Sequence, residues 1–96
     1  MEDKNQPIIH VAIADDDPAA LKEIVRQINL FDGFVIDIIT DSGEELISRL
    51  AKMNKRLDIC LFDIKLRGKN GYETLAEIKK RWPQGCCILN KFITFM

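Results

Sequence analysis

The sequence has little of what would indicate a membrane-bound or disulfide-stabilised protein. Its 96 residues include three cysteines, three prolines and five glycines, and aromatic residues make up 7%. The longest apolar stretch, Ile8 to Ala14, is interrupted by His10 and falls far short of the roughly 20 residues of a membrane span. The residues before Ile8 do not resemble a signal peptide. We therefore expect no membrane contact and a cytoplasmic location.

An excess of positive charge is also absent. The chain has 14 Lys and Arg against 15 Asp and Glu, a net charge of -1, so we expect no direct nucleic acid binding. Cys60, Cys86 and Cys87 are odd in number, lie in apolar runs and lack metal-ligand spacing. We interpret them as reduced core thiols. With 47% hydrophobic and 30% charged residues, positions 1–96 are predicted to form one folded domain.

Strand-like and helix-like segments alternate along the chain. The four strand-like runs are Ile8 to Ala14, Phe34 to Ile39, Leu57 to Phe62 and Cys86 to Leu89. Amphipathic helices are predicted between them, from Asp17 to about Leu30, from Ser42 to about Met53 and from Asn70 to Trp82. This alternation predicts parallel strands joined by right-handed crossovers, with helices on both faces of the sheet.

Each predicted helix begins at a capping residue. Asp17 before Pro18 is typical of an N-cap and first helical residue, and Asn70 is a good N-cap. Ser42 and Glu45 have the spacing of a capping box, in which each side chain accepts a hydrogen bond from the other residue's backbone.

Acidic residues follow two of the predicted strands directly. Asp15 and Asp16 come after the first strand and Asp63 after the third, so neighbouring parallel strands would bring their carboxylates together. Mutual repulsion favours a cation there, and oxygen ligands without nearby His or Cys favour Mg²⁺. In the alternative interpretation, Asp15 to Asp17 only cap a helix.

These residues resemble the receiver domain of two-component response regulators. In that family an acidic pair closes the first strand, as Asp15 and Asp16 do, and the phosphoacceptor closes the third, as Asp63 does. Gly68 and the pair Asn70-Gly71 also match the family pattern. The loop that contains them carries Arg67 where proline is common, and it looks most like that of regulators with LytTR-type DNA-binding domains.

The resemblance implies a flavodoxin-like, three-layer α/β fold. In the family, five parallel strands have the order 2-1-3-4-5 and alternate with five helices. This chain would form the order 2-1-3-4, with the first helix on one face and the second and third on the other. We expect a truncated domain, lacking the fifth strand with its lysine and the last two helices.

The resemblance also implies a signalling domain rather than an enzyme. Asp63 would accept a phosphoryl group from a histidine kinase, and the output would be control of transcription. Asp16 would ligate Mg²⁺ directly, Asp15 directly or through water, and the Lys65 backbone carbonyl would add a ligand. Asn90 stands where a phosphate-sensing Ser or Thr is usual.

Three further hypotheses concern function and assembly. A degenerate receiver would only bind a protein partner. A phosphatase similar to the haloacid dehalogenases would use Asp15 as the nucleophile of the Asp-x-Asp motif Asp15 to Asp17. An open sheet edge at Cys86 to Phe95 would favour a homo-oligomer.

Overall fold

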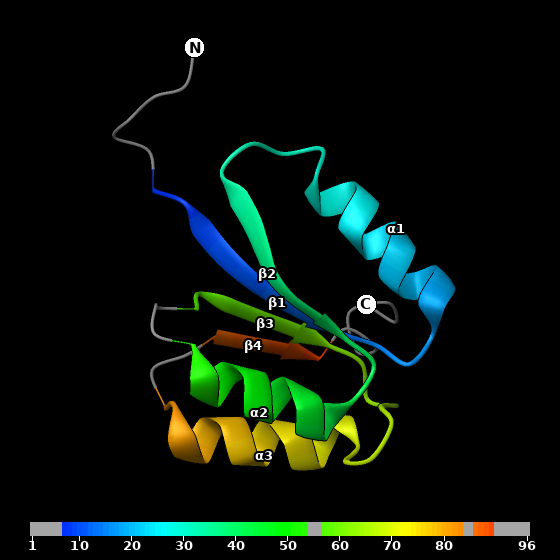
Figure 1. Cartoon of the computed structure of the whole chain (residues 1–96), viewed down its shortest axis with the longest axis vertical. Helices are drawn as coiled ribbons and strands as arrows, with labels where there is room; N and C mark the ends of the chain where they lie inside the picture. Colours follow the sequence, from blue (N-terminus) through cyan, green and yellow to red (C-terminus); the bar gives the residue numbers. More distant parts are fainter. Residues whose placement is uncertain (1–6, 54–56, 84–85, 90–96) are drawn as a thin grey trace.

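The computed structural model describes residues 7–53, 57–83 and 86–89 and has an α/β fold (Figure 1). Its elements, in chain order, are β1 (Ile9–Ala14), α1 (Pro18–Ile28), β2 (Phe34–Thr40), α2 (Gly43–Lys52), β3 (Ile59–Phe62), α3 (Gly71–Arg81) and β4 (Cys86–Leu89). All strand pairs are parallel and the strand order is β2-β1-β3-β4, which confirms the predicted topology. Figure 1 shows α1 on one side of the sheet, and α2 and α3 side by side on the other.

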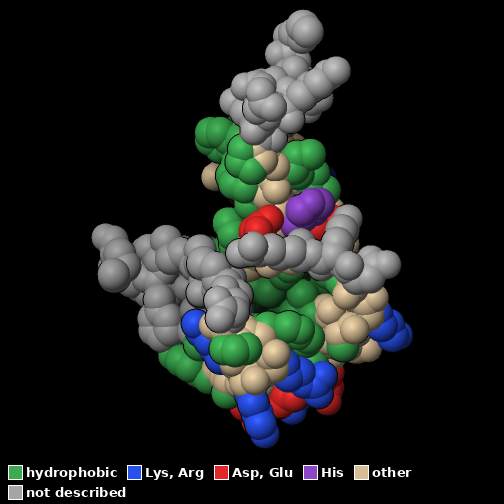
Figure 2. Space-filling model, turned by 90° about the vertical axis from the view of Figure 1, so that its left-hand side faces the viewer, with side chains coloured by type: hydrophobic (Ala, Val, Ile, Leu, Met, Phe, Trp, Pro, Cys, Tyr) green, Lys and Arg blue, Asp and Glu red, His purple; other side chains and the backbone are tan. Residues whose placement is uncertain are grey.

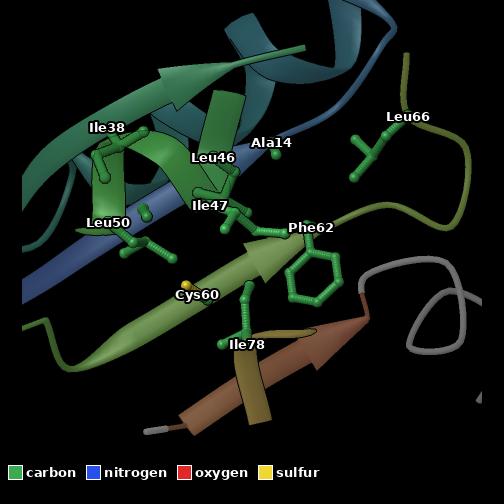
Figure 3. Packing of buried hydrophobic residues seen from close by; sticks show 10 residues of the cluster. Ala14, Ile38, Leu46, Ile47, Leu50, Cys60, Phe62, Leu66 and Ile78 are labelled. Atoms are coloured by element: carbon green, nitrogen blue, oxygen red, sulfur yellow. The ribbon is translucent and has the colours of Figure 1, made fainter. Parts of the chain in front are cut away.

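Alternation along the strands divides the buried side chains between the two faces of the sheet. Ala12 and Ala14 of β1 face α2 and α3, and Val11 and Ile13, which alternate with them, point to the opposite face. The main core lies on the α2–α3 side (Figure 3) and comprises Ala12, Ala14, Ile38, Leu46, Ile47, Leu50, Cys60, Phe62, Leu66 and Ile78. Cys60 is a buried free thiol, as predicted, and the side chains of Cys86 and Cys87 lie outside the described part.

The apolar stripe of α1 is only partly covered. None of the residues of α1 is buried, although its apolar positions lie at the expected helical spacing. The helix begins as predicted, because Asp17 accepts a hydrogen bond from the Ala19 N–H and Pro18 is the first helical residue. It ends at Ile28, two residues before the predicted limit, and a turn at Gly33 (φ 92°) leads into β2.

Only one of the two hydrogen bonds of the capping box predicted at the start of α2 forms. The Ser42 hydroxyl oxygen accepts from the Glu45 N–H at 3.2 Å, but the Ser42 N–H donates to Thr40 Oγ1. Thr40 ends the preceding strand and its hydroxyl also donates to the Glu45 carboxylate at 2.7 Å, which draws that side chain away from the Ser42 backbone. A complete capping box forms at α3 between Asn70 and Glu73.

The pairing of β1 and β2 contains one irregularity. Val11 pairs with Ile36 and Ala12 with Ile38, so Asp37 is an extra residue in β2. The carboxylate of Asp37 lies 2.7 Å from His10 Nδ1. Figure 2 shows the histidine at the surface beside acidic side chains. The histidine of the first strand is therefore a partly buried, paired side chain.

Within the described ranges, none of the three helices is long and apolar enough to cross a bilayer.

Candidate metal centre

Two backbone hydrogen bonds bring the acidic residues together at the carboxyl end of the sheet. The Asp15 N–H donates to the Thr40 carbonyl at the end of β2, and the Asp63 N–H donates to the Ala14 carbonyl at the end of β1. The parallel ladder is thus continued by one residue on each strand. Because the chain leaves all three strands at the same edge, the carboxylates of Asp15 and Asp63 converge as predicted.

The acidic cluster has three carboxylates, which differ in burial. One oxygen from each of Asp15, Asp16 and Asp63 lies within 4.8 Å of the others. Asp15 is 3% exposed and Asp63 4% exposed, whereas Asp16 faces solvent. Two ionised carboxylates about 5 Å apart repel by roughly 3 kcal/mol at an effective dielectric constant of 20. The site therefore concentrates negative charge on two buried carboxylates and one exposed carboxylate.

The pKa of Asp15 is raised by its position in this cluster. Burial raises the pKa of Asp15 above its ordinary value of 3.8, and the charges of Asp63, Asp16 and Asp17 raise that pKa further. A hydrogen bond from the Asp17 N–H to Asp15 Oδ1, 2.9 Å long, acts in the opposite direction. Without a cation the folded protein therefore holds the Asp15 proton more tightly than the unfolded chain does.

The chemistry of the donor set fits Mg²⁺. All three side chains offer hard carboxylate oxygens, and this ion commonly takes one or two carboxylates and completes its shell with water. The exposed Asp16 leaves the cluster accessible to such a hydrated ion. Lys65 lies two residues after Asp63 with an exposed side chain, and ligation by its carbonyl stays a prediction.

Asp63 is held by the loop that follows it. The Ile64 N–H donates to Asp63 Oδ1 at 2.7 Å, and the Gly71 N–H donates to the Ile64 carbonyl at 2.5 Å. A Cβ atom at Gly71 would lie 2.5 Å from the Asp63 carbonyl oxygen, so only glycine fits there. Asn90, predicted at the phosphate-sensing position, lies outside the described residues.

The structure also shows a contact near the site that the sequence did not predict. Arg67, on the loop after Asp63, forms an ion pair with Asp41 at 2.9 Å. These residues are 26 positions apart, and neither belongs to a periodic pattern or a capping motif. Only the two loops' proximity in the fold reveals the pair.

Comparison with known sequences places the chain in a family that has this fold and this acidic cluster. The family model of the response regulator receiver domain matches residues 11–90. Over 72 residues, the chain is 33% identical to the transcriptional regulatory protein MalR of Bacillus subtilis (strain 168). The match covers 75% of this chain and 30% of MalR, so the chain spans less than a third of that relative.

Solved structures similar to this fold include three of the response regulator RcsB. The Salmonella typhimurium protein aligns with a TM-score of 0.77 and 23% identity over 84% of this chain and 42% of RcsB. The non-phosphorylated receiver domain of Escherichia coli RcsB gives 0.76 and 21%, covering 85% of this chain and 63% of that domain. The isolated domain from Salmonella enterica serovar Typhimurium, solved in the presence of phosphomimetic BeF3-, gives 0.78 and 22%, covering 85% and 60%. At these identities the likeness establishes the fold.

Proposed function

Because the chain belongs to the response regulator receiver domain family of two-component systems, we propose that it accepts a phosphoryl group on Asp63. The observation that carries the proposal is the position of Asp63, buried at the end of β3 with Asp15 and Asp16 within 4.8 Å. A carboxylate beside a cation-binding cluster has the surroundings that an aspartyl phosphate requires.

The proposed reaction is a transfer from nitrogen to oxygen. An oxygen of the Asp63 carboxylate attacks the phosphorus atom of a phosphohistidine on a sensor histidine kinase. The phosphorus–nitrogen bond breaks, its electron pair stays on the imidazole, and the imidazole takes up a proton. The Ile64 N–H, which donates to Asp63 Oδ1 at 2.7 Å, fixes the orientation of the attacking carboxylate.

Asp15, Asp16, Asp63 and the Lys65 carbonyl are the proposed metal ligands. Bound Mg²⁺ would neutralise the charge that the phosphoryl oxygens bring to the acidic cluster. Each phosphoryl group adds about 1.5 to 2 negative charges. The residues therefore need a divalent cation more after transfer than before it.

We also propose an output and a cellular location for the protein. MalR is named as a transcriptional regulatory protein, and we propose that phosphorylation here also controls transcription. A buried free thiol at Cys60 suits the reducing cytoplasm, where we place the protein. No direct contact with nucleic acid is proposed for these 96 residues, whose net charge is -1.

Self-association through β4 is a second part of the proposal. Within the described sheet β4 is the end strand beyond β3, and unpaired strand edges can recruit another strand. Of the predicted segment Cys86 to Phe95, the part after Leu89 lies outside the described residues. Sedimentation velocity at micromolar concentration should show a dimer or larger species, and a monomer throughout would contradict this part.

Binding of beryllium trifluoride, a phosphoryl mimic, tests the proposed site. Isothermal titration calorimetry should detect binding only with Mg²⁺ present, and Asp63→Asn should abolish it. Asp32→Asn, in the exposed turn before β2, is the control for removing one carboxylate and should bind as the wild type does.

The calorimetric result also separates the alternatives. A degenerate receiver would bind no beryllium trifluoride in any variant. Binding that survives Asp63→Asn and is lost in Asp15→Asn would support the phosphatase hypothesis and overturn the assignment of Asp63.

A further inference from the structure

The loop that carries Asp63 is joined to the loop between β2 and α2. The Arg67 N–H donates to the Asp41 carbonyl at 2.9 Å, and the Gly43 N–H donates to the Arg67 carbonyl at 3.2 Å. Ser42 and Arg67 form an isolated parallel bridge between these bonds. Both backbone groups of Arg67 therefore bind one partner loop, as if the sheet ladder were extended by one residue.

The Arg67 side chain adds an ion pair to the same partner. Its guanidinium lies 2.9 Å from Asp41 Oδ1, with side-chain exposures of 71% for Arg67 and 47% for Asp41. Such exposed pairs contribute little to overall stability. Since the pair links the residues whose backbones are also bonded, its main effect is to fix the two loops relative to one another.

The rest of the loop has little freedom to move independently. Leu66, directly before Arg67, is 8% exposed and belongs to the core cluster. Gly68, directly after it, has φ 80°, a backbone conformation in which a residue with a side chain is strained. Gly71 then closes the loop on the backbone of Asp63 and Ile64. A change at Arg67 is thus transmitted to Asp63 through a short, packed segment.

We propose that Arg67 is a positioning residue, which holds the Asp63 loop in the shape needed for cation binding by anchoring it to Asp41 and Gly43. The inference rests on the proposed function, because the cation site is the one proposed there. It adds that the β2–α2 loop is part of the site's framework, although it supplies none of the proposed ligands.

Arg67→Ala removes the ion pair with Asp41 and keeps both backbone hydrogen bonds of Arg67. We expect Mg²⁺ affinity to fall about threefold in Arg67→Ala. Arg26→Ala, which removes an exposed ion pair on α1, is the matched control and should leave the affinity unchanged.

A charge exchange tests whether the pair itself matters. Arg67→Asp and Asp41→Arg should each weaken Mg²⁺ binding, and the double variant should recover most of the affinity. A merely destabilising change at either position would not be rescued by the second change.

Amide hydrogen exchange, followed by NMR on the metal-free protein, distinguishes this inference from the proposed function. If Arg67 positions the loop, Ile64 and Gly71 amides should exchange at least about threefold faster in Arg67→Ala, with residues of α1 unchanged. Unchanged exchange at Ile64 and Gly71 would overturn the inference, whatever the wild type does with Mg²⁺. If the wild type bound no Mg²⁺ while exchange accelerated as expected, the proposed function would fail and the positioning role would stand.

Discussion

At the scale of single residues, Asp15 is a buried acidic group whose negative charge lowers the stability of the fold. Its carboxyl group is 3% exposed and faces Asp63 and Asp16, and burial with these charges raises its pKa. An ionised Asp15 therefore destabilises the metal-free fold at neutral pH. We predict that Asp15→Asn raises the midpoint of thermal unfolding in the absence of Mg²⁺, by about 4–8 °C for each kcal/mol gained.

The pH dependence of this effect follows from the direction of the shift. Because the folded-state pKa of Asp15 is above the unfolded value of 3.8, stability is highest when the group is protonated and falls as pH rises through that interval. Calorimetric scans of both proteins should show the advantage of Asp15→Asn at neutral pH and its loss below about pH 3.8. An advantage of equal size at all pH values would contradict the electrostatic explanation.

A second prediction concerns the contribution of the contact between His10 and Asp37 to stability. Their side chains lie 2.7 Å apart at the irregular pairing of β1 and β2, with exposures of 24% and 11%. A double-mutant cycle of His10→Ala and Asp37→Asn, followed by urea unfolding, should give a coupling free energy of about 0.5–1.5 kcal/mol. The exposed pair Glu23 and Arg26 serves as a comparison and should couple more weakly. Additive effects at His10 and Asp37 would show that the contact contributes nothing.

At the scale of elements, the start of α3 links the fold to the acidic site. Gly71 is the first residue of α3, and a Cβ there would lie 2.5 Å from the Asp63 carbonyl oxygen and 2.6 Å from Ile64 Cα. We predict that Gly71→Ala destabilises the protein by about 1–3 kcal/mol and weakens Mg²⁺ binding, because backbone atoms must move.

A control on the same helix separates lost stability from lost geometry. Ala76 lies on the exposed face of α3, and Ala76→Gly should cost about 1 kcal/mol through helix propensity alone. Urea unfolding and Mg²⁺ titration of both variants should show reduced stability in each but weaker binding only in Gly71→Ala. Equal Mg²⁺ affinities in the two variants would refute the role given to Gly71.

Capping residues and apolar spacing predicted the helices and strands well. Where a predicted cap did not form in full, a neighbouring group had taken one of its hydrogen-bond partners. Asp17 before Pro18 marked the start of α1 because a cap needs only adjacent residues. Only half of the capping box at Ser42 forms, because the Thr40 hydroxyl at the end of β2 donates to the Glu45 carboxylate and accepts from the Ser42 N–H. Such competition depends on where a strand ends in space, which the spacing of residues along the chain does not contain.

At the scale of the whole molecule, the cation site should contribute to stability. A ligand that binds only the folded state stabilises it by about 1.4 kcal/mol at ten times its dissociation constant. We predict that saturating Mg²⁺ raises the unfolding midpoint of the wild type by several degrees at neutral pH. Differential scanning calorimetry should show no comparable rise in Asp63→Asn, and Asp32→Asn should respond as the wild type does. An equal response in Asp63→Asn would place the bound ion elsewhere.

The topology and the acidic cluster could be predicted from the sequence because both follow from the order of elements. Once strands and helices alternate, the sheet is parallel, and Asp15 and Asp63 must leave it at one edge. The pairing of Arg67 with Asp41 could not be predicted, since it depends on two irregular loops. The partial exposure of the apolar stripe of α1 was likewise not indicated by its spacing.

The most direct test of the central claim is covalent labelling of the acceptor. The wild type is incubated with a small acyl phosphate and Mg²⁺, and mass spectrometry then measures the added phosphoryl group and locates it by peptide mapping. We predict one phosphoryl group on Asp63, dependence on Mg²⁺, and no label in Asp63→Asn. A label on Asp15, a label that persists in Asp63→Asn, or no label on the wild type would contradict the assignment of Asp63 as phosphoacceptor.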